Sequence, residues 1–126
     1  MREAPSLDLI RALVDEGALV TAFDPKSGPA AAAVLPSSVS LTENVVQCAE
    51  GTQALVLNSP SNPTGAAYSH EELLAIAEVA ENHDLFVISD EIYSEITYDD
   101  YAFRSFPTLR PGLRERTAVV SGWSKT

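Results

Sequence analysis

The stretch from Ala54 to Ile88, ALVLNSPSNPTGAAYSHEELLAIAEVAENHDLFVI, decides the fold. It opens with a continuous apolar run over 54–57, which is typical of a strand buried on both faces of a parallel sheet. Ser69 and Glu72 have the spacing of a capping box and predict a helix that runs to about Asn82. We expect this helix to pack through Leu73, Ile76, Ala77 and Ala80. A second apolar run over 85–88 follows, so the order strand–helix–strand predicts a parallel sheet.

The flanking sequence extends this alternation in both directions. A helix is predicted over about 6–16, with Gly17 placed to end it, and a second helix is predicted from a cap at Thr42 to Gly51. Residues 26–38 are rich in Gly, Pro, Ala and Ser and predict a loop. The fold class is therefore α/β, a Rossmann-like layered fold with a mainly parallel sheet of about four strands. These strands are expected at 19–23, 54–57, 85–88 and 117–120.

Composition narrows the classes of function. The 126 residues carry 8 Lys and Arg against 18 Asp and Glu, a net charge of −10, which disfavours nucleic acid and anionic membrane surfaces as partners. No apolar run approaches the ~18 residues of a membrane span, and the N-terminus lacks the pattern of a signal peptide. A cytoplasmic location is expected. The single cysteine, Cys48, is expected to pack as a small apolar side chain, and no metal site is predicted.

Polar segments follow three of the expected strands: 58–65, 89–93 and 121–126. Ligands of open α/β sheets bind beyond the carboxyl ends of the strands. If these strands are neighbours, an amide, a carboxylate, a phenol and an amine meet at one edge. This set suits a nitrogen heterocycle that bears an exocyclic oxygen and an aldehyde. Each segment alone also has a plain structural explanation, as a turn, a helix cap or a solvated lysine.

Together the three segments resemble the pyridoxal-phosphate aminotransferases of the aspartate aminotransferase type, over roughly residues 53–126. The resemblance implies that Lys125 is the lysine that forms a Schiff base with the cofactor. It also implies that Asp90 pairs with the pyridinium nitrogen, and that Tyr93 and Asn62 bind the ring oxygen O3′. It places Ser124 or Ser121 near the phosphate.

Residues 1–57 resemble a different family, the C-terminal UDP-binding domain of UDP-glucose 6-dehydrogenases. That resemblance rests on Met1–Ser6, on the helix that follows, on Val20–Pro25 and on the helix–strand unit up to Leu57. The two resemblances meet near Ala54–Asn58. They predict a single chimeric domain over 1–126, recombined or designed, with a dehydrogenase-like half (1–57) and an aminotransferase-like half (58–126). Both ends are expected to have been cut from larger parents.

The favoured hypothesis assigns this chimera no catalysis of its own, because the aminotransferase part lacks the family's other phosphate and substrate contacts. Pyridoxal phosphate is accordingly not expected to be retained. The alternative is a pyridoxal-phosphate-binding segment of an aminotransferase that forms a Schiff base through Lys125, and a UDP-sugar binder ranks last. Right-handed crossovers would place all connecting helices on one face of the sheet. The bare face predicts self-association, as a homodimer or by an element swap.

Overall fold

The computed structural model describes residues 5–24, 28–62 and 65–122, with the side chains of 5, 28 and 29 left out. The chain divides into two compact units, Met1–Glu50 and Gly51–Thr126. The two units are described separately below. The three polar segments of the sequence analysis all belong to the second unit.

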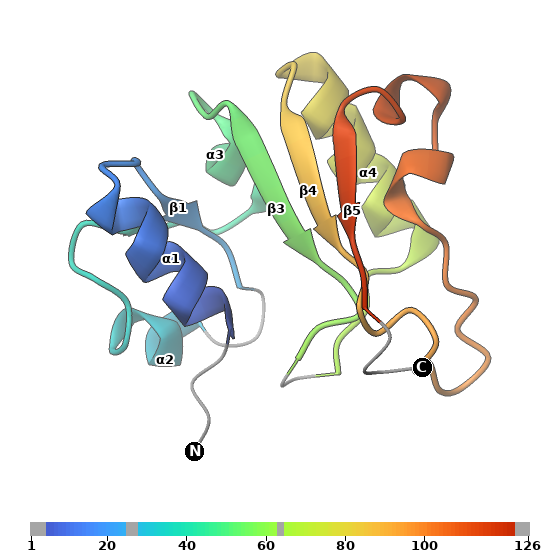
Figure 1. Cartoon of the computed structure of the whole chain (residues 1–126), viewed down its shortest axis with the longest axis horizontal. Coiled ribbons are helices and arrows are strands. Elements are labelled where there is room, and N and C mark those ends of the chain that lie inside the picture. Colours follow the sequence, from blue (N-terminus) through green and yellow to red (C-terminus); the bar gives the residue numbers. More distant parts are fainter. Residues whose placement is uncertain (1–4, 25–27, 63–64, 123–126) are drawn as a thin grey trace. The chain divides into compact units, whose positions relative to one another are not determined.

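A three-stranded parallel sheet forms the centre of the second unit (Figure 1). Its strands are β3 (Ala54–Asn58), β4 (Phe86–Asp90) and β5 (Thr117–Val120), hydrogen-bonded in the order β3-β4-β5. The register pairs Asn58 with Asp90, and Asp90 in turn with Val120. All three overlap the predicted strands, but β3 ends one residue later than predicted and β4 runs over 86–90 where 85–88 was predicted. Because they are parallel neighbours, the polar segments that follow them start at the same edge.

Helix α4 (His70–Asn82) connects β3 to β4 and begins at the predicted capping box. The Glu72 N–H donates to Ser69 Oγ at 3.2 Å, and the Ser69 N–H donates to Glu72 Oε2 at 2.7 Å. These two bonds satisfy backbone donors that the first helical turn leaves unpaired. The buried residues of the helix are the four predicted ones, Leu73, Ile76, Ala77 and Ala80.

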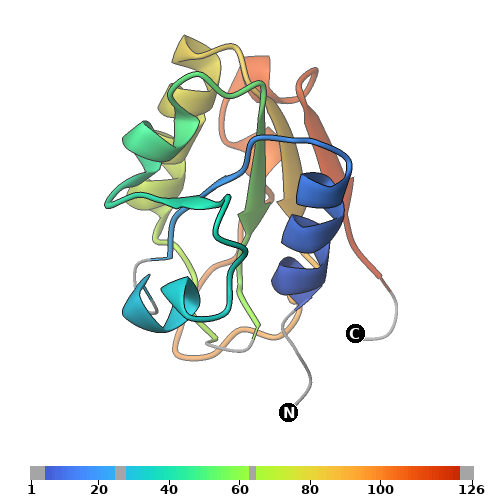
Figure 2. The same cartoon turned by 90° about the vertical axis from the view of Figure 1, so that its left-hand side faces the viewer.

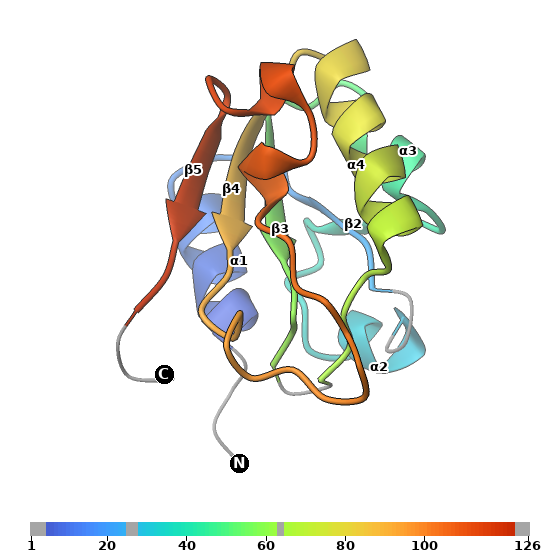
Figure 3. The ribbon, with the colours of Figure 1, turned by 90° about the vertical axis from the view of Figure 1, so that its right-hand side faces the viewer.

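The core of this unit lies on one face of the sheet. Two short 3₁₀ helices, η1 (Phe106–Thr108) and η2 (Pro111–Leu113), lie on the same side of the sheet as α4 (Figure 3). The largest fully buried side chains are Phe106, Leu85, Leu113 and Val87. The core therefore joins strand, helix and 3₁₀ residues that are far apart in the sequence.

The opposite face of the sheet presents apolar side chains. Val56, Phe86 and Val120 share this face by register and are 43%, 48% and 48% exposed. Among the described residues of this unit, both 3₁₀ helices and α4 lie on the other face (Figures 1 and 3). Within the unit, the arrangement agrees with the one-sided helix packing expected from right-handed crossovers.

Among its described residues, the first unit contains three helices and a second, two-stranded sheet, with α1 in view in Figure 2. Helix α1 (Pro5–Asp15) ends as predicted before Gly17, whose φ of +86° favours glycine. The other elements are β1 (Thr21–Ala22), α2 (Gly28–Ala32), β2 (Ser40–Leu41) and α3 (Val45–Ala49). Helix α2 lies within the stretch predicted to be a loop, where a run of alanines favours helix.

The predicted four-stranded sheet is not found among the described residues. Strand β1 pairs in parallel with β2, which the sequence analysis did not recognise, and Thr21 is the register partner of Ser40. Thr42 does not cap α3: its N–H donates to the carbonyl oxygen of Ala22 at 3.0 Å and so extends the β1–β2 ladder. Asn44 caps the helix, accepting from the Gln47 N–H at 2.9 Å. Within the described ranges, no helix has the length and apolar character of a membrane span.

Candidate functional site

The carboxyl edge of the β3-β4-β5 sheet holds the candidate site, where the chain leaves all three strands (Figure 1). Backbone bonds continue the ladder beyond the strands. The Ser59 N–H donates to the carbonyl oxygen of Asp90 at 3.3 Å, and the Glu91 N–H donates to that of Val120 at 2.9 Å. These bonds hold the first two polar segments next to each other, and the second next to the end of β5, after which the third begins.

Asn62 and Tyr93 lie side by side at this edge. The amide nitrogen Nδ2 of Asn62 donates to the phenol oxygen of Tyr93 at 2.8 Å. Asn62 is exposed and Tyr93 is half-buried, so both remain accessible to a ligand. A phenol can both accept a hydrogen bond at its oxygen and donate one through its O–H. The structure thus brings together the two residues that the resemblance assigned to one ring oxygen.

Asp90, the last residue of β4, is half-buried at the same edge of the sheet. Its Oδ2 accepts from Asn58 Nδ2 at 2.8 Å, and its Oδ1 accepts from the Ile92 N–H at 3.3 Å. The second bond links an aspartate to the backbone two residues on, the geometry of an Asx turn and not of a helix cap. A carboxylate oxygen has two lone pairs, so acceptor capacity remains on both oxygens.

Of the three other predicted site residues, the structure describes only Ser121. Ser121 is exposed and directly follows β5 at the same edge. Lys125 and Ser124 lie outside the described residues. Among those that are described, no group of three or more His, Cys, Asp or Glu side chains could hold a metal ion.

Glu91 is a buried carboxylate that the sequence analysis passed over. It is 4% exposed, and its Oε1 accepts from Ser89 Oγ at 3.0 Å and from the Phe106 N–H at 2.8 Å. It therefore ties the end of β4 to the start of η1, between Asp90 and Tyr93 in the sequence. The only signal in the sequence was an acidic residue within the polar segment 89–93, which follows a strand predicted to be buried.

Tyr101 anchors the loop that follows β3. Its hydroxyl donates to the carbonyl oxygen of Tyr68 at 2.8 Å, and the Tyr68 N–H donates to the buried Ser59 Oγ at 3.2 Å. Burial raises the pKa of the Tyr101 phenol, a hydrogen bond with the Ser59 side chain lowers it, and the Glu72 carboxylate raises it. Tyr101 is thus a neutral donor at physiological pH, consistent with its bond to a carbonyl.

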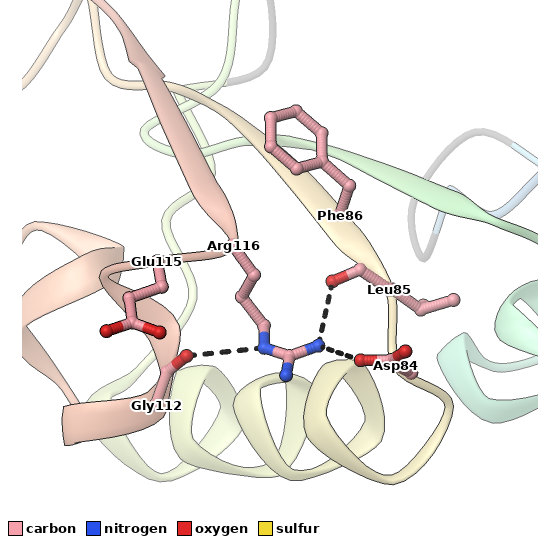
Figure 4. A pocket seen from close by; sticks show the side chains of 6 residues that line it. All are labelled: Asp84, Leu85, Phe86, Gly112, Glu115 and Arg116. Carbon is pink, nitrogen blue, oxygen red and sulfur yellow. Dashed lines mark hydrogen bonds and ion pairs between the residues drawn. The ribbon is translucent and has the colours of Figure 1, made fainter.

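A shallow hollow of about 350 Å³ lies at the opposite, amino end of β4 and β5 (Figure 4). Arg116 crosses it: its Nη1 donates to Asp84 Oδ1 at 2.8 Å and its Nε donates to the carbonyl oxygen of Gly112 at 3.2 Å. The Nη1 also reaches the carbonyl oxygen of Leu85 at 3.5 Å. These bonds engage two of the three guanidinium nitrogens and tie the amino ends of β4 and β5 together, so we assign the hollow a structural role, apart from the candidate site.

Comparison with known proteins identifies the family. The sequence model of the family of class I and II aminotransferases matches residues 38–126, and the chain belongs to this family. It is 47% identical over 77 residues to an aspartate aminotransferase of Bacillus subtilis (strain 168), and 49% identical over 77 residues to that of Pyrococcus abyssi. Each match covers 61% of this chain and 20% of the relative. The chain thus spans about a fifth of the length of the curated relatives it matches.

Solved structures extend the likeness to the whole fold. The aromatic aminotransferase of Pyrococcus horikoshii matches with a TM-score of 0.62 and 32% identity, over 84% of this chain and 33% of that one. Cystalysin of Treponema denticola matches with a TM-score of 0.66 over 97% of this chain and 36% of that one. Its 21% identity shows likeness of fold alone.

These matches bear on the predicted chimera. The family match starts at residue 38 and runs through Ala54–Asn58, where two parent families were expected to meet. Cystalysin is alike in fold over 97% of this chain, so one known fold covers nearly all of it. The findings therefore favour an aminotransferase segment over a chimera, and they give the dehydrogenase resemblance no support.

Proposed function

We propose that the carboxyl edge of the β3-β4-β5 sheet is the pyridoxal-phosphate-binding edge of an aminotransferase. The observation that carries this proposal is the 2.8 Å bond between Asn62 and Tyr93, on the edge that also holds the Asp90–Asn58 pair. Membership of the class I and II aminotransferases supports it. So does the presence of pyridoxal 5′-phosphate in cystalysin, a protein of like fold.

The residues present fit the chemical groups of this cofactor. A pyridine nitrogen that carries a proton needs an anionic acceptor, and Asp90 supplies a carboxylate with lone pairs to spare. A phenolate oxygen needs donors, which the Tyr93 hydroxyl and the Asn62 amide can provide. The aldehyde needs an amine, which by the family resemblance is Nζ of Lys125. When bound, pyridoxal phosphate acts as an electron sink that stabilises negative charge on the substrate's α-carbon.

Each residue then has a distinct task. Asp90 holds the proton at the ring nitrogen, and Tyr93 with Asn62 orients the ring through O3′. Lys125 Nζ holds the cofactor at its carbonyl carbon, and Ser121 and Ser124 are proposed phosphate contacts. Rate in such an enzyme depends on several groups positioned around the reacting carbon. We therefore expect the 126-residue chain to bind the cofactor weakly and not to transfer amino groups by itself.

Lysine substitution gives the direct test, because the chain contains only Lys26 and Lys125. Titration with pyridoxal phosphate should produce a saturable absorbance band near ~420 nm that is lost in Lys125→Ala and kept in the matched control Lys26→Ala. Borohydride reduction followed by peptide mass spectrometry should place the label on Lys125. A label divided evenly between the two lysines, or a band that persists in Lys125→Ala, would refute the proposal.

The hypotheses of a chimera and of a UDP-sugar binder remain predictions without support from the comparisons. A raised melting temperature in UDP-glucose would favour the second of them. No change in melting temperature, measured beside the titration with pyridoxal phosphate, would remove it.

A further inference from the structure

Asn58 lies beside the carboxylate on which the proposed function depends. It is the last residue of β3, and its register partner across the sheet is Asp90, the last residue of β4. Register partners on parallel neighbouring strands point to the same face of a sheet. The two side chains are thus brought together by the sheet itself, 32 residues apart in sequence, with Nδ2 of Asn58 2.8 Å from Oδ2 of Asp90.

Two donors hold the Asp90 carboxylate from different parts of the chain. Asn58 donates to Oδ2 from the neighbouring strand, and the Ile92 N–H donates to Oδ1 from the turn after β4. The terminal torsion of an aspartate is broad and weakly restricted by itself. One donor on each oxygen fixes the plane of the carboxylate, and the remaining lone pairs stay available for a third donor.

The backbone donor belongs to the turn and is present whatever side chain Asn58 carries. Of the two contacts, only the amide of Asn58 can therefore be removed by a substitution that leaves the Asp90 loop intact. Asn58 is half-buried at the end of a strand whose one buried residue is Leu57. Its loss should affect the carboxylate more than the fold.

We infer that Asn58 is a positioning residue, which orients the Asp90 carboxylate toward the ring nitrogen without touching the cofactor. The inference rests on the proposed function. Without the Asn58 bond, the Asp90 carboxylate would spend less time in the plane that faces the ring N–H. The hydrogen bond between them is charge-assisted, and its strength depends on the alignment of donor and acceptor. Asn58→Ala should therefore weaken binding of pyridoxal phosphate by about tenfold, the scale of one charge-assisted hydrogen bond.

An exchange of the two side chains separates positioning from a structural role. The double variant Asn58→Asp/Asp90→Asn keeps one amide and one carboxylate facing each other, in nearly the same volume. It should retain the wild-type melting temperature, yet lose the ~420 nm band, because the carboxylate then stands on β3 and not on β4. The single variant Asn58→Asp places two carboxylates together and should lose both stability and the band. Asn82→Ala, an exposed amide at the end of α4, is the matched control and should change neither.

A measurement without cofactor tests the contact itself. In the full chain labelled with ¹⁵N, the side-chain amide signal of Asn58 should move in Asp90→Ala and stay unchanged in the exposed-site variant Glu95→Ala. An unmoved signal overturns the inference by itself. So does an Asn58→Ala variant that binds pyridoxal phosphate as the wild type does, a result that leaves the proposed function standing. Absence of a saturable band in the wild-type chain would instead overturn the proposed function, and the inference with it.

Discussion

Removal of the Glu91 carboxylate is the most demanding test of this structure. Glu91→Ala would leave the Phe106 N–H and the Ser89 hydroxyl without their acceptor in a buried environment. Each unsatisfied buried donor costs about 1–3 kcal/mol. Two of them give a predicted loss of about 3–5 kcal/mol in the free energy of unfolding, a large share of the ~5–15 kcal/mol typical of a small domain.

Glu91→Gln separates the acceptor from the charge. Its amide oxygen can still accept from both donors, so only the charge-assisted part of the bonds is lost, about 1 kcal/mol. Ser89→Ala removes one of the two donors along with its need for an acceptor, and it should also cost about 1 kcal/mol. Glu95→Ala removes an exposed carboxylate from the same loop and should change stability by less than about 0.5 kcal/mol.

Urea unfolding at neutral pH, followed by circular dichroism, measures these differences in the midpoint at constant slope. The expected order of stability is wild type and Glu95→Ala first, then Glu91→Gln and Ser89→Ala, and Glu91→Ala last. If Glu91→Ala and Glu91→Gln unfold at the same urea concentration, the acceptor role assigned to Glu91 is wrong. The same conclusion follows if Glu91→Ala loses less than about 1 kcal/mol.

Three further predictions concern other parts of the chain. Ser69→Ala removes the side-chain half of the capping box and should destabilise the chain by about 1 kcal/mol in the same urea assay, with no effect if α4 does not need its cap. Burial raises the pKa of the Cys48 thiol, so less thiolate is present at a given pH. Iodoacetamide should therefore modify Cys48 more slowly in the folded chain than in the urea-unfolded chain. Equal rates would contradict this prediction. The exposed apolar face of the β3-β4-β5 sheet predicts self-association, so light scattering should give a mass above the 13.5 kDa of the monomer. In Phe86→Lys the mass should fall toward that of the monomer. A monomeric wild type would count against the prediction.

Local pattern was enough to predict much of the second unit. Helix α4 was predicted with its capping box and its four buried residues, because capping and a 3.6-residue period depend on side chains a few positions apart. The strands β3, β4 and β5 were predicted because buried parallel strands are continuous apolar runs. Asn62, Asp90 and Tyr93 belong to polar segments that were expected to gather at one edge of the sheet, and the resemblance to aminotransferases singled these three residues out.

The sequence by itself thus determined the strands and the α-helix of the second unit, and the end of the sheet where the polar groups lie, but not the two 3₁₀ helices. Only tertiary structure decided which groups touch: Asn62 with Tyr93, Asn58 with Asp90, and Glu91 with the start of η1. It also decided that Thr42 extends a β1–β2 ladder and does not cap a helix. These contacts join residues 15 to 32 positions apart in the sequence. They depend on the register of neighbouring strands and on where the loops bring the chain back to the sheet, and neither can be recognised from a few adjacent residues.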